Sequence, residues 1–120
     1  MGRIHVTVAL KNLSPPTGTY EADFLVDTGA TDSLAPAAEL KRIGVQPAET
    51  MTYELADGTI QEYPFGLVQI EFMGEITAGR VIFGPDGAEP LLGVSALESV
   101  GIMVDPTNHT PKRLPAIPLK

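Results

Sequence analysis

The stretch Phe24-Leu25-Val26-Asp27-Thr28-Gly29-Ala30 sets an apolar run directly before a carboxylate, a hydroxyl residue and two small residues. Such an apolar run is typical of a buried strand, and Asp, Thr and Gly favour a turn after it. A strand that ends in a turn explains the stretch without any chemistry. Because a bare Asp-Thr-Gly triplet arises by chance in roughly a few per cent of chains of this length, the rest of the sequence must decide whether the carboxylate is functional.

The whole chain has the size and composition of a single globular domain over residues 1–120. Of its 120 residues, 43% are apolar and 19% are charged, which is not the composition of a disordered chain. Eight basic and fifteen acidic residues give a net charge of −7, which argues against a nucleic acid as the partner.

The residue inventory also removes several kinds of catalytic site. The sequence has no cysteine, so disulfides, thiolate zinc sites and cysteine nucleophiles are excluded. His5 and His109 are too few for a multi-histidine metal site, and no metal or organic cofactor is expected. A serine triad that uses His109 is disfavoured, because no serine lies in a Gly-x-Ser-x-Gly context.

The sequence carries no signal for a membrane or for secretion. No run approaches the roughly 18 consecutive apolar residues of a membrane span, so no membrane partner is expected. The N-terminal residues lack the basic-then-apolar order of a signal peptide. The default expectation is a soluble, cytoplasmic protein.

Alternation of apolar and polar residues predicts a mostly β domain with many turns. Strands are expected over residues 4–10, 20–26, 51–55, 60–65, 67–72, 76–83 and 102–104. The stretch 12–18 is expected to be a turn, and His5 is expected to face solvent. Asp57-Gly58, between two of these strands, is a strong signal for a two-residue hairpin turn.

Two short helices are expected as well. The first has Pro36 in its first turn and Gly44 as its C-terminal cap. In the second, Ser95 and Glu98 have the spacing of a capping box, and Gly101 closes the helix.

Three features then follow one another along the chain: Asp27-Thr28-Gly29-Ala30, the hairpin around Asp57-Gly58, and Leu91-Leu92-Gly93 at the start of the second helix. In this order they resemble the retropepsin-like aspartic proteases, the single-domain relatives of the retroviral protease. Ile82-Phe83-Gly84 also spells apolar-apolar-Gly, but it leads into the turn Pro85-Asp86-Gly87 rather than into a helix. The resemblance covers most of the chain and implies an all-β fold: a small closed barrel with two short helices and one flap hairpin per chain.

The resemblance implies an endopeptidase that hydrolyses extended peptide segments with a water activated between two aspartates. Two carboxylates about 3 Å apart repel by roughly 5 kcal/mol at an effective dielectric near 20, so the pair holds one proton and can act as base and as acid. The chain carries the motif once, so the mechanism requires a homodimer in which Asp27 faces its symmetry mate.

The resemblance also implies roles for the neighbouring residues. Thr28 hydrogen-bonds across the two-fold axis, and the Gly29 N–H donates to the carboxylates. Ala30 is small where the substrate backbone passes. Asp32 either contacts the substrate backbone or caps the loop, and both interpretations stay open. The flap residues Ala56, Asp57, Gly58 and Thr59 would fold over the bound peptide.

Two departures from the viral pattern bear on the dimer and on activity. The viral enzymes pair an Arg after the apolar-apolar-Gly with an acid after the Asp-Thr-Gly-Ala, and here these positions hold Val94 and Thr31. Pro115 and Pro118 also remove ladder donors from a tail that the viral dimer interlaces. A catalytically silent module for peptide binding or self-association is therefore the alternative to the enzyme. The intact Asp-Thr-Gly-Ala favours the enzyme, because a binding module does not need a carboxylate pair.

Aromatic residues in the flap give a weaker signal. Tyr53 and Tyr63 lie in the predicted hairpin, where they could line the flap. Aromatic residues in hairpins more often serve packing, so neither is assigned to the site.

Overall fold

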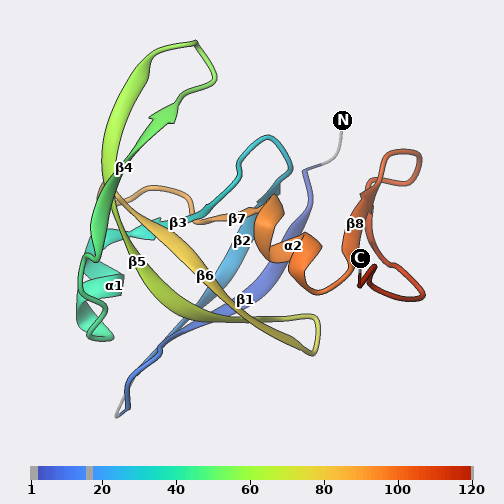
Figure 1. Ribbon diagram of the computed structural model, residues 1–120, viewed down its shortest axis with the longest axis horizontal. Helices are drawn as coiled ribbons and strands as arrows, with labels where there is room; N and C mark the ends of the chain where they lie inside the picture. Colours follow the sequence, from blue (N-terminus) through green and yellow to red (C-terminus); the bar gives the residue numbers. More distant parts are fainter. Residues whose placement is uncertain (1–2, 16–17, 120) are drawn as a thin grey trace.

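Figure 1 shows the computed structural model, in which residues 3–15 and 18–119 are described. These residues form nine strands and two short helices. The strands are β1 (His5–Asn12), β2 (Thr19–Asp27), β3 (Ser33–Pro36), β4 (Glu49–Glu54), β5 (Ile60–Phe72), β6 (Glu75–Gly84), β7 (Leu91–Gly93), β8 (Ile102–Asp105) and β9 (Thr110–Arg113). The helices are α1 (Ala37–Arg42) and α2 (Val94–Ser99). Residues 16–17 of the turn predicted over 12–18 lie outside the described residues.

Six strands close into a barrel within the described part of the chain. They are joined in the order β1-β2-β7-β3-β6-β5, and β1 pairs again with β5 from Val8↔Phe72 to Asn12↔Val68. β4 is added to the outer edge of β5, and the resulting hairpin rises above the barrel in Figure 1. The expected fold is confirmed: a closed β barrel with two short helices and one flap hairpin.

Alternating inward side chains of the strands fill the barrel. Val8 and Leu10 of β1 and Phe24 of β2 are fully buried, as the period of two predicts. The other elements add Leu40, Val68, Ile70, Val81, Leu92, Leu97 and Ile102 to the same core. Because the side chain of Phe24 is buried in this core, β2 is held in place up to its last residue, Asp27.

The stretch predicted as two strands, 60–65 and 67–72, is one continuous strand of 13 residues, β5. The glycine between them, Gly66, is buried within the strand and does not end it. A Cβ at Gly66 would lie 2.6 Å from Cγ1 of Val45, so the glycine allows close packing. The next turn, Met73-Gly74, has φ values of 52° and 77°, as a two-residue hairpin turn requires, and Glu75, predicted as part of the connection, is the first residue of β6.

The flap hairpin is connected by a longer loop than the predicted two-residue turn. Residues 55–59 lie between β4 and β5. The Gly58 N–H donates to the Leu55 carbonyl at 2.9 Å, and the Leu55 N–H donates to the Thr59 carbonyl at 2.8 Å. Gly58 has φ +88°, so it supplies the left-handed residue with which the four-residue turn 55–58 ends. The Asp57 carboxylate accepts hydrogen bonds from the Thr59 N–H and hydroxyl, which fix the loop tip.

The segment after the Asp27 loop contains a strand that the sequence did not predict. β3 pairs in parallel with β6 from Ser33↔Val81 to Pro36↔Gly84, and it meets β7 at Leu34↔Leu91. Pro36 ends this strand and is the N-cap of α1, and does not lie in the first helical turn. Gly44, with φ +84°, ends α1 as predicted.

The predicted capping box at the second helix is wrong. α2 begins at Val94 with Gly93 as N-cap and without a side-chain cap, so Ser95 is the second helical residue. The predicted stop is confirmed, because Gly101 follows the end of α2 with φ +72°.

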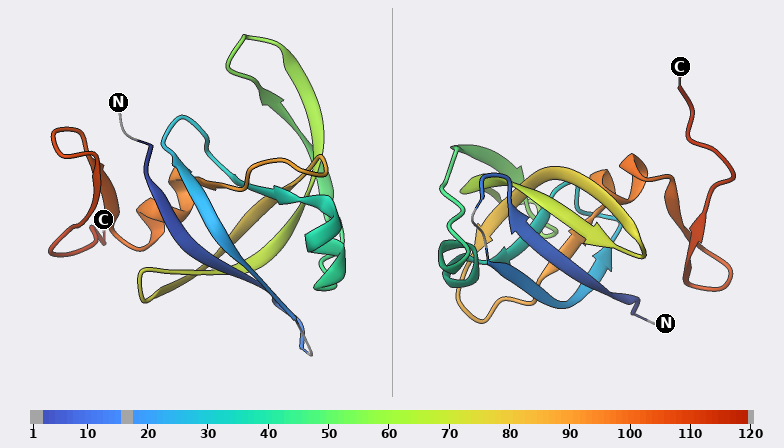
Figure 2. Two further views of the ribbon diagram at one scale, coloured as in Figure 1. Left: turned by 180° about the vertical axis from the view of Figure 1, so that it is seen from behind. Right: turned by 90° about the horizontal axis from the view of Figure 1, so that it is seen from below.

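The C-terminal region forms a separate two-stranded sheet, β8–β9, rather than a last core strand. In β8, Ile102 is buried, whereas Met103 is 43% exposed. Figure 2 shows this hairpin standing away from the barrel. It is held to the β5–β6 turn, because the Arg113 guanidinium contacts the Glu75 carboxylate and the Met73 carbonyl. Strand β9 was not predicted, and the tail that contains Pro115 and Pro118 follows it without regular structure.

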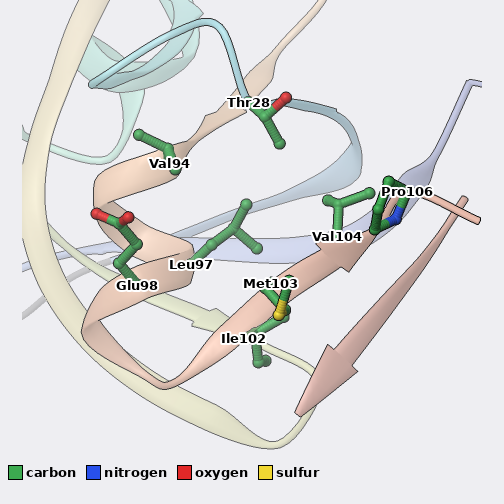
Figure 3. A pocket seen from close by; sticks show the side chains of 8 residues that line it. All are labelled: Thr28, Val94, Leu97, Glu98, Ile102, Met103, Val104 and Pro106. Carbon is green, nitrogen blue, oxygen red and sulfur yellow. The ribbon is translucent and has the colours of Figure 1, made fainter. Parts of the chain in front are cut away.

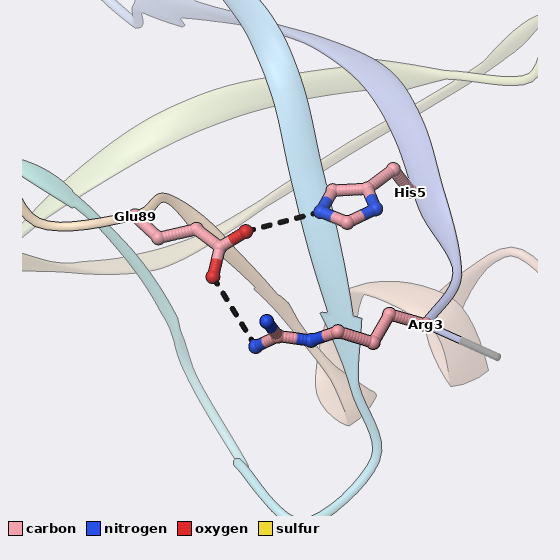
Figure 4. Close-up of polar contacts among 3 residues, drawn as sticks. All are labelled: Arg3, His5 and Glu89. Carbon is pink, nitrogen blue, oxygen red and sulfur yellow. Dashed lines mark hydrogen bonds and ion pairs between the residues drawn. The ribbon is translucent and has the colours of Figure 1, made fainter. Parts of the chain in front are cut away.

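The start of β1 is tied to the segment that leads into β7 (Figure 4). His5 is exposed, as predicted, and its Nε2 lies 3.0 Å from the Glu89 carboxylate, which Arg3 also contacts at 3.4 Å. The Leu25 N–H donates to the Pro90 carbonyl at 3.0 Å. These contacts join β1 and the segment before β7, and β1 and β7 are the two strands that flank the end of β2.

Candidate active site

Asp27 is the last residue of β2, at the edge of the barrel. It pairs in parallel with Gly93 of β7, and on the other side the Val26 N–H donates to the Ile4 carbonyl at 2.8 Å. Its side chain is half-buried. The preceding strand therefore delivers one carboxylate at a fixed point on the barrel rim.

The loop that follows turns back on this carboxylate. The Gly29 N–H donates to Asp27 Oδ1 at 3.0 Å, and the Ala30 N–H donates to the Asp27 carbonyl at 3.1 Å. A Cβ at Gly29 would lie 3.3 Å from the same Oδ1, closer than most real Cβ contacts. The loop thus orients the carboxylate with a backbone donor, and glycine leaves room for it.

The start of α2 supports the loop from below. The N–H groups of Val94 and Ser95, which a helix leaves without internal partners, donate to the carbonyls of Ala30 and Thr31 at 2.8 and 3.1 Å. Val94 and Thr31 are the positions at which the viral pattern has a charged pair. Here, backbone hydrogen bonds join the loop and the helix at these positions.

Ser33 is a buried polar residue that the sequence analysis missed. Its side chain is 2% exposed, and its Oγ accepts a hydrogen bond from the Gly93 N–H at 3.0 Å. A Cβ at Gly93 would lie 2.6 Å from the Asp32 backbone, so only glycine fits here without a shift. Leu91-Leu92-Gly93 is therefore the apolar-apolar-Gly segment that contacts the loop after Asp27, as the sequence analysis preferred. The competing segment, Ile82-Phe83-Gly84, pairs with β3 instead.

A groove of ≈ 770 Å³ runs between the loop and the flap strand β4. Four of the residues predicted for the site line it together with Asp27, namely Gly29, Ala30, Asp32 and Ala56. The flap residues Asp57, Gly58 and Thr59 lie at the loop tip and are exposed. Most of the remaining lining is apolar or aromatic and includes Leu34, Met51, Tyr53, Leu55, Tyr63, Ile82 and Leu91.

Two residues in the groove, Tyr53 and Arg80, were not assigned to the site from the sequence. The Tyr53 hydroxyl donates to Asp32 Oδ2 at 2.7 Å, and Arg80 Nη1 lies 3.9 Å from the same oxygen. Burial, followed by the hydrogen bond to Asp32, raises the pKa of Tyr53 to about 12. The Asp32 side chain is only 10% exposed, so its carboxylate is largely covered by its own chain.

Thr28 does not line this groove. It is exposed and lies at a second cavity of ≈ 400 Å³ between α2 and β8 (Figure 3). Most of the other lining residues are apolar and come from the helix and the hairpin: Val94, Leu97, Glu98, Ile102, Met103, Val104 and Pro106. The Asp27-Thr28-Gly29-Ala30 segment therefore presents Asp27 to one cavity and Thr28 to another.

The closed barrel, the Asp-Thr-Gly-Ala loop and the flap define the class of retropepsin-like aspartic proteases. Residues 17–99 match the family model described as "gag-polyprotein putative aspartyl protease", and the chain belongs to this family. The chain is also similar to the solution structure of the simian foamy virus (mac) protease, with 20% identity and a TM-score of 0.54. That similarity covers 77% of this chain and 89% of the viral one, and it supports the fold. A search of curated proteins found no match.

The comparisons confirm the family that the sequence resemblance named. Among the described residues, no helix is long and apolar enough to span a membrane.

Proposed function

We propose that the chain is an aspartic endopeptidase whose active site forms at the two-fold axis of a homodimer. Each protomer contributes one Asp27. The observation that carries this proposal is the position of Asp27: half-buried at the rim, oriented by the Gly29 N–H and open to a groove beneath the flap. Membership of an aspartyl protease family supports it.

The chemistry follows from two carboxyl groups that hold a single proton. The ionised Asp27 takes a proton from water as the water oxygen attacks the scissile carbonyl carbon. The protonated Asp27 of the second protomer donates its proton to the carbonyl oxygen, which gives a neutral gem-diol. When the C–N bond breaks, the carboxyl group that took the water proton donates it to the leaving nitrogen. The other, ionised carboxylate takes a proton from a gem-diol hydroxyl, so the pair again holds one proton.

The homodimer is supported by what a single chain presents. The sequence contains one Asp-Thr-Gly, and a lone carboxylate has no partner with which to share a proton. Thr28 is exposed beside an apolar cavity, where the hydroxyl of a second copy's threonine can meet it. Burial of such an apolar surface favours association of two copies.

The proposed substrate is a polypeptide segment in an extended conformation. A strand-like peptide places alternate side chains on opposite sides, which suits a groove with the catalytic loop below and the flap above. The apolar and aromatic lining supplies pockets for side chains, and closure of residues 56–59 over the peptide would exclude water.

The test is cleavage of casein or of a peptide library between about pH 4 and 7, with and without a statine-type inhibitor. Asp27→Asn should abolish cleavage and leave the circular dichroism spectrum unchanged. Asp86→Asn, in the exposed turn after β6, is the matched control and should cleave like the wild type. Retained cleavage in Asp27→Asn would remove this residue from the mechanism. Peptide binding without turnover in the wild type would favour the silent module instead.

A further inference from the structure

The flap strand β4 is an edge strand, so a neighbouring strand fixes its position on one side only. Within the described residues, β4 is the last strand in the sheet order and pairs with β5 alone. Its distance from the catalytic loop therefore depends on side-chain contacts. Two such contacts reach across to the barrel: Tyr53 to Asp32, and Met51 to Arg80.

The hydrogen bond from Tyr53 ends on a rigid acceptor. Asp32 lies in the loop that follows Asp27, and its backbone packs directly on Gly93. Its neighbour Ser33 is buried and hydrogen-bonded to that glycine. A bond from the flap to Asp32 thus fixes the flap relative to the catalytic carboxylate.

Arg80 reaches the same acceptor from β6. Its guanidinium lies 4.8 Å from the centre of the Phe65 ring and 3.9 Å from Asp32 Oδ2. The oxygen that accepts from the Tyr53 hydroxyl is therefore also in contact with a side chain of the barrel.

We propose that Tyr53 is a positioning residue whose hydrogen bond to Asp32 holds β4 at the height that shapes the substrate groove above Asp27. Asp32 then serves as the anchor of the flap and does not itself bind the substrate. The proposal rests on the proposed protease function for its kinetic consequences. The high pKa of Tyr53 agrees with it, because the phenol stays protonated and able to donate at any pH suited to cleavage.

The kinetic test compares Tyr53→Phe, Asp32→Ala, Asp32→Asn and the double variant Tyr53→Phe/Asp32→Ala. Tyr53→Phe and Asp32→Ala should each raise KM about tenfold with kcat nearly unchanged, because each removes the same hydrogen bond and neither touches Asp27. The double variant should be no worse than either single variant. Asp32→Asn should restore a KM near that of the wild type, because the amide oxygen still accepts from the phenol.

The matched control is Tyr20→Phe. Tyr20 is half-buried on β2, packs against Phe24 with ring centroids 6.0 Å apart, and does not line the groove. It should leave KM and kcat as in the wild type. A KM that rises equally in Asp32→Asn and Asp32→Ala but not in Tyr53→Phe would show that Asp32 binds substrate directly, and would overturn the proposal.

Hydrogen–deuterium exchange of the β4 amides tests the same contact without any enzyme activity. Tyr53→Phe and Asp32→Ala should speed exchange in β4, whereas Asp32→Asn and Tyr20→Phe should not. Unchanged exchange in Tyr53→Phe would overturn the positioning role. A second outcome is a wild type that shows no cleavage while these exchange differences are still observed. In that case the proposed protease function is wrong, and the role of the Tyr53–Asp32 hydrogen bond in positioning β4 is supported.

Discussion

Gly93 lies where the backbone of β7 touches the loop that carries Asp27. A Cβ at this position would come within 2.6 Å of the carbonyl carbon and oxygen of Asp32 and 2.7 Å from the Thr31 carbonyl oxygen. These are backbone atoms, and the Thr31 carbonyl is itself bonded to the Ser95 N–H. The loop cannot move aside without losing the hydrogen bonds that place it.

Gly93→Ala should therefore destabilise the protein by about 1–3 kcal/mol and abolish cleavage. Gly79→Ala in β6 is the control, because a Cβ there would meet its nearest atom at 3.9 Å, an ordinary contact. Urea unfolding of both variants measures the difference. Equal stability of the two would mean that the contact of β7 with the loop is looser than described.

Tyr53 makes a second contribution at the residue scale, one that depends on pH. Its pKa is raised from 10.0 to about 12 by burial and by the bond to Asp32, so the folded state prefers the protonated phenol. The stabilisation is complete below pH 10 and is lost as the pH rises toward 12. The stability difference between wild type and Tyr53→Phe should be constant below pH 10 and shrink above it. Denaturant unfolding across this range measures it, and a difference that persists unchanged to pH 11 would contradict the assignment.

Among the elements, α2 has an unusual start. No side chain caps it, and its first amides donate instead to carbonyls of the loop that follows Asp27. The Gly93 N–H, just before the helix, is satisfied by the buried Ser33 hydroxyl. The stability of this helix and the position of Asp27 are therefore coupled through the loop between β2 and β3.

Substitution of Ser33 and of Ser95 tests whether α2 depends on the buried Ser33 hydroxyl or on the capping box that the sequence predicted. Ser33→Ala should cost about 1–3 kcal/mol, because it leaves the buried Gly93 N–H without an acceptor. Ser95→Ala should be nearly neutral, since Ser95 is exposed and caps nothing. Thermal unfolding of both variants decides between the two views. A larger loss in Ser95→Ala than in Ser33→Ala would restore the capping box.

The elements that the sequence predicted correctly carry their signal locally. Gly44 and Gly101 end helices through their own backbone conformation, and Met73-Gly74 forms its turn in the same way. The elements that were missed depend on distant partners. β3 exists because β6 and β7 flank it, and Gly66 continues a strand because Val45 packs on it. No local pattern in either segment records those neighbours.

The candidate site divides in the same way. The motif placed Asp27, Gly29 and Ala30 at the groove, because neighbours in sequence share one loop. Tyr53 and Arg80 reach Asp32 from β4 and β6, and their approach depends on the closed barrel. The sequence around a hairpin tyrosine is the same whether the ring only packs or its hydroxyl bonds to a distant strand. The role of Tyr53 could therefore not be predicted from the sequence alone.

At the scale of the whole molecule, a single chain presents half of the catalytic arrangement proposed here. One rim carries Asp27 at the groove and Thr28 at the apolar cavity beside the β8–β9 hairpin. The hairpin stands outside the barrel, and Arg113 holds it to the β5–β6 turn. This surface suits a second copy, although the charge of −7 on each chain opposes association at low salt.

The most direct measurement mixes wild type with Asp27→Asn at chain concentrations where sedimentation shows dimers. A dimer with one Asn lacks the second carboxyl group, so a wild-type chain that pairs with a mutant chain no longer forms part of a working site. With random pairing, the cleavage rate at constant wild type should fall to about half at equal amounts and to about a tenth at ninefold excess of the mutant. A rate that does not change as Asp27→Asn is added would show that one chain cleaves alone, and would contradict the shared active site.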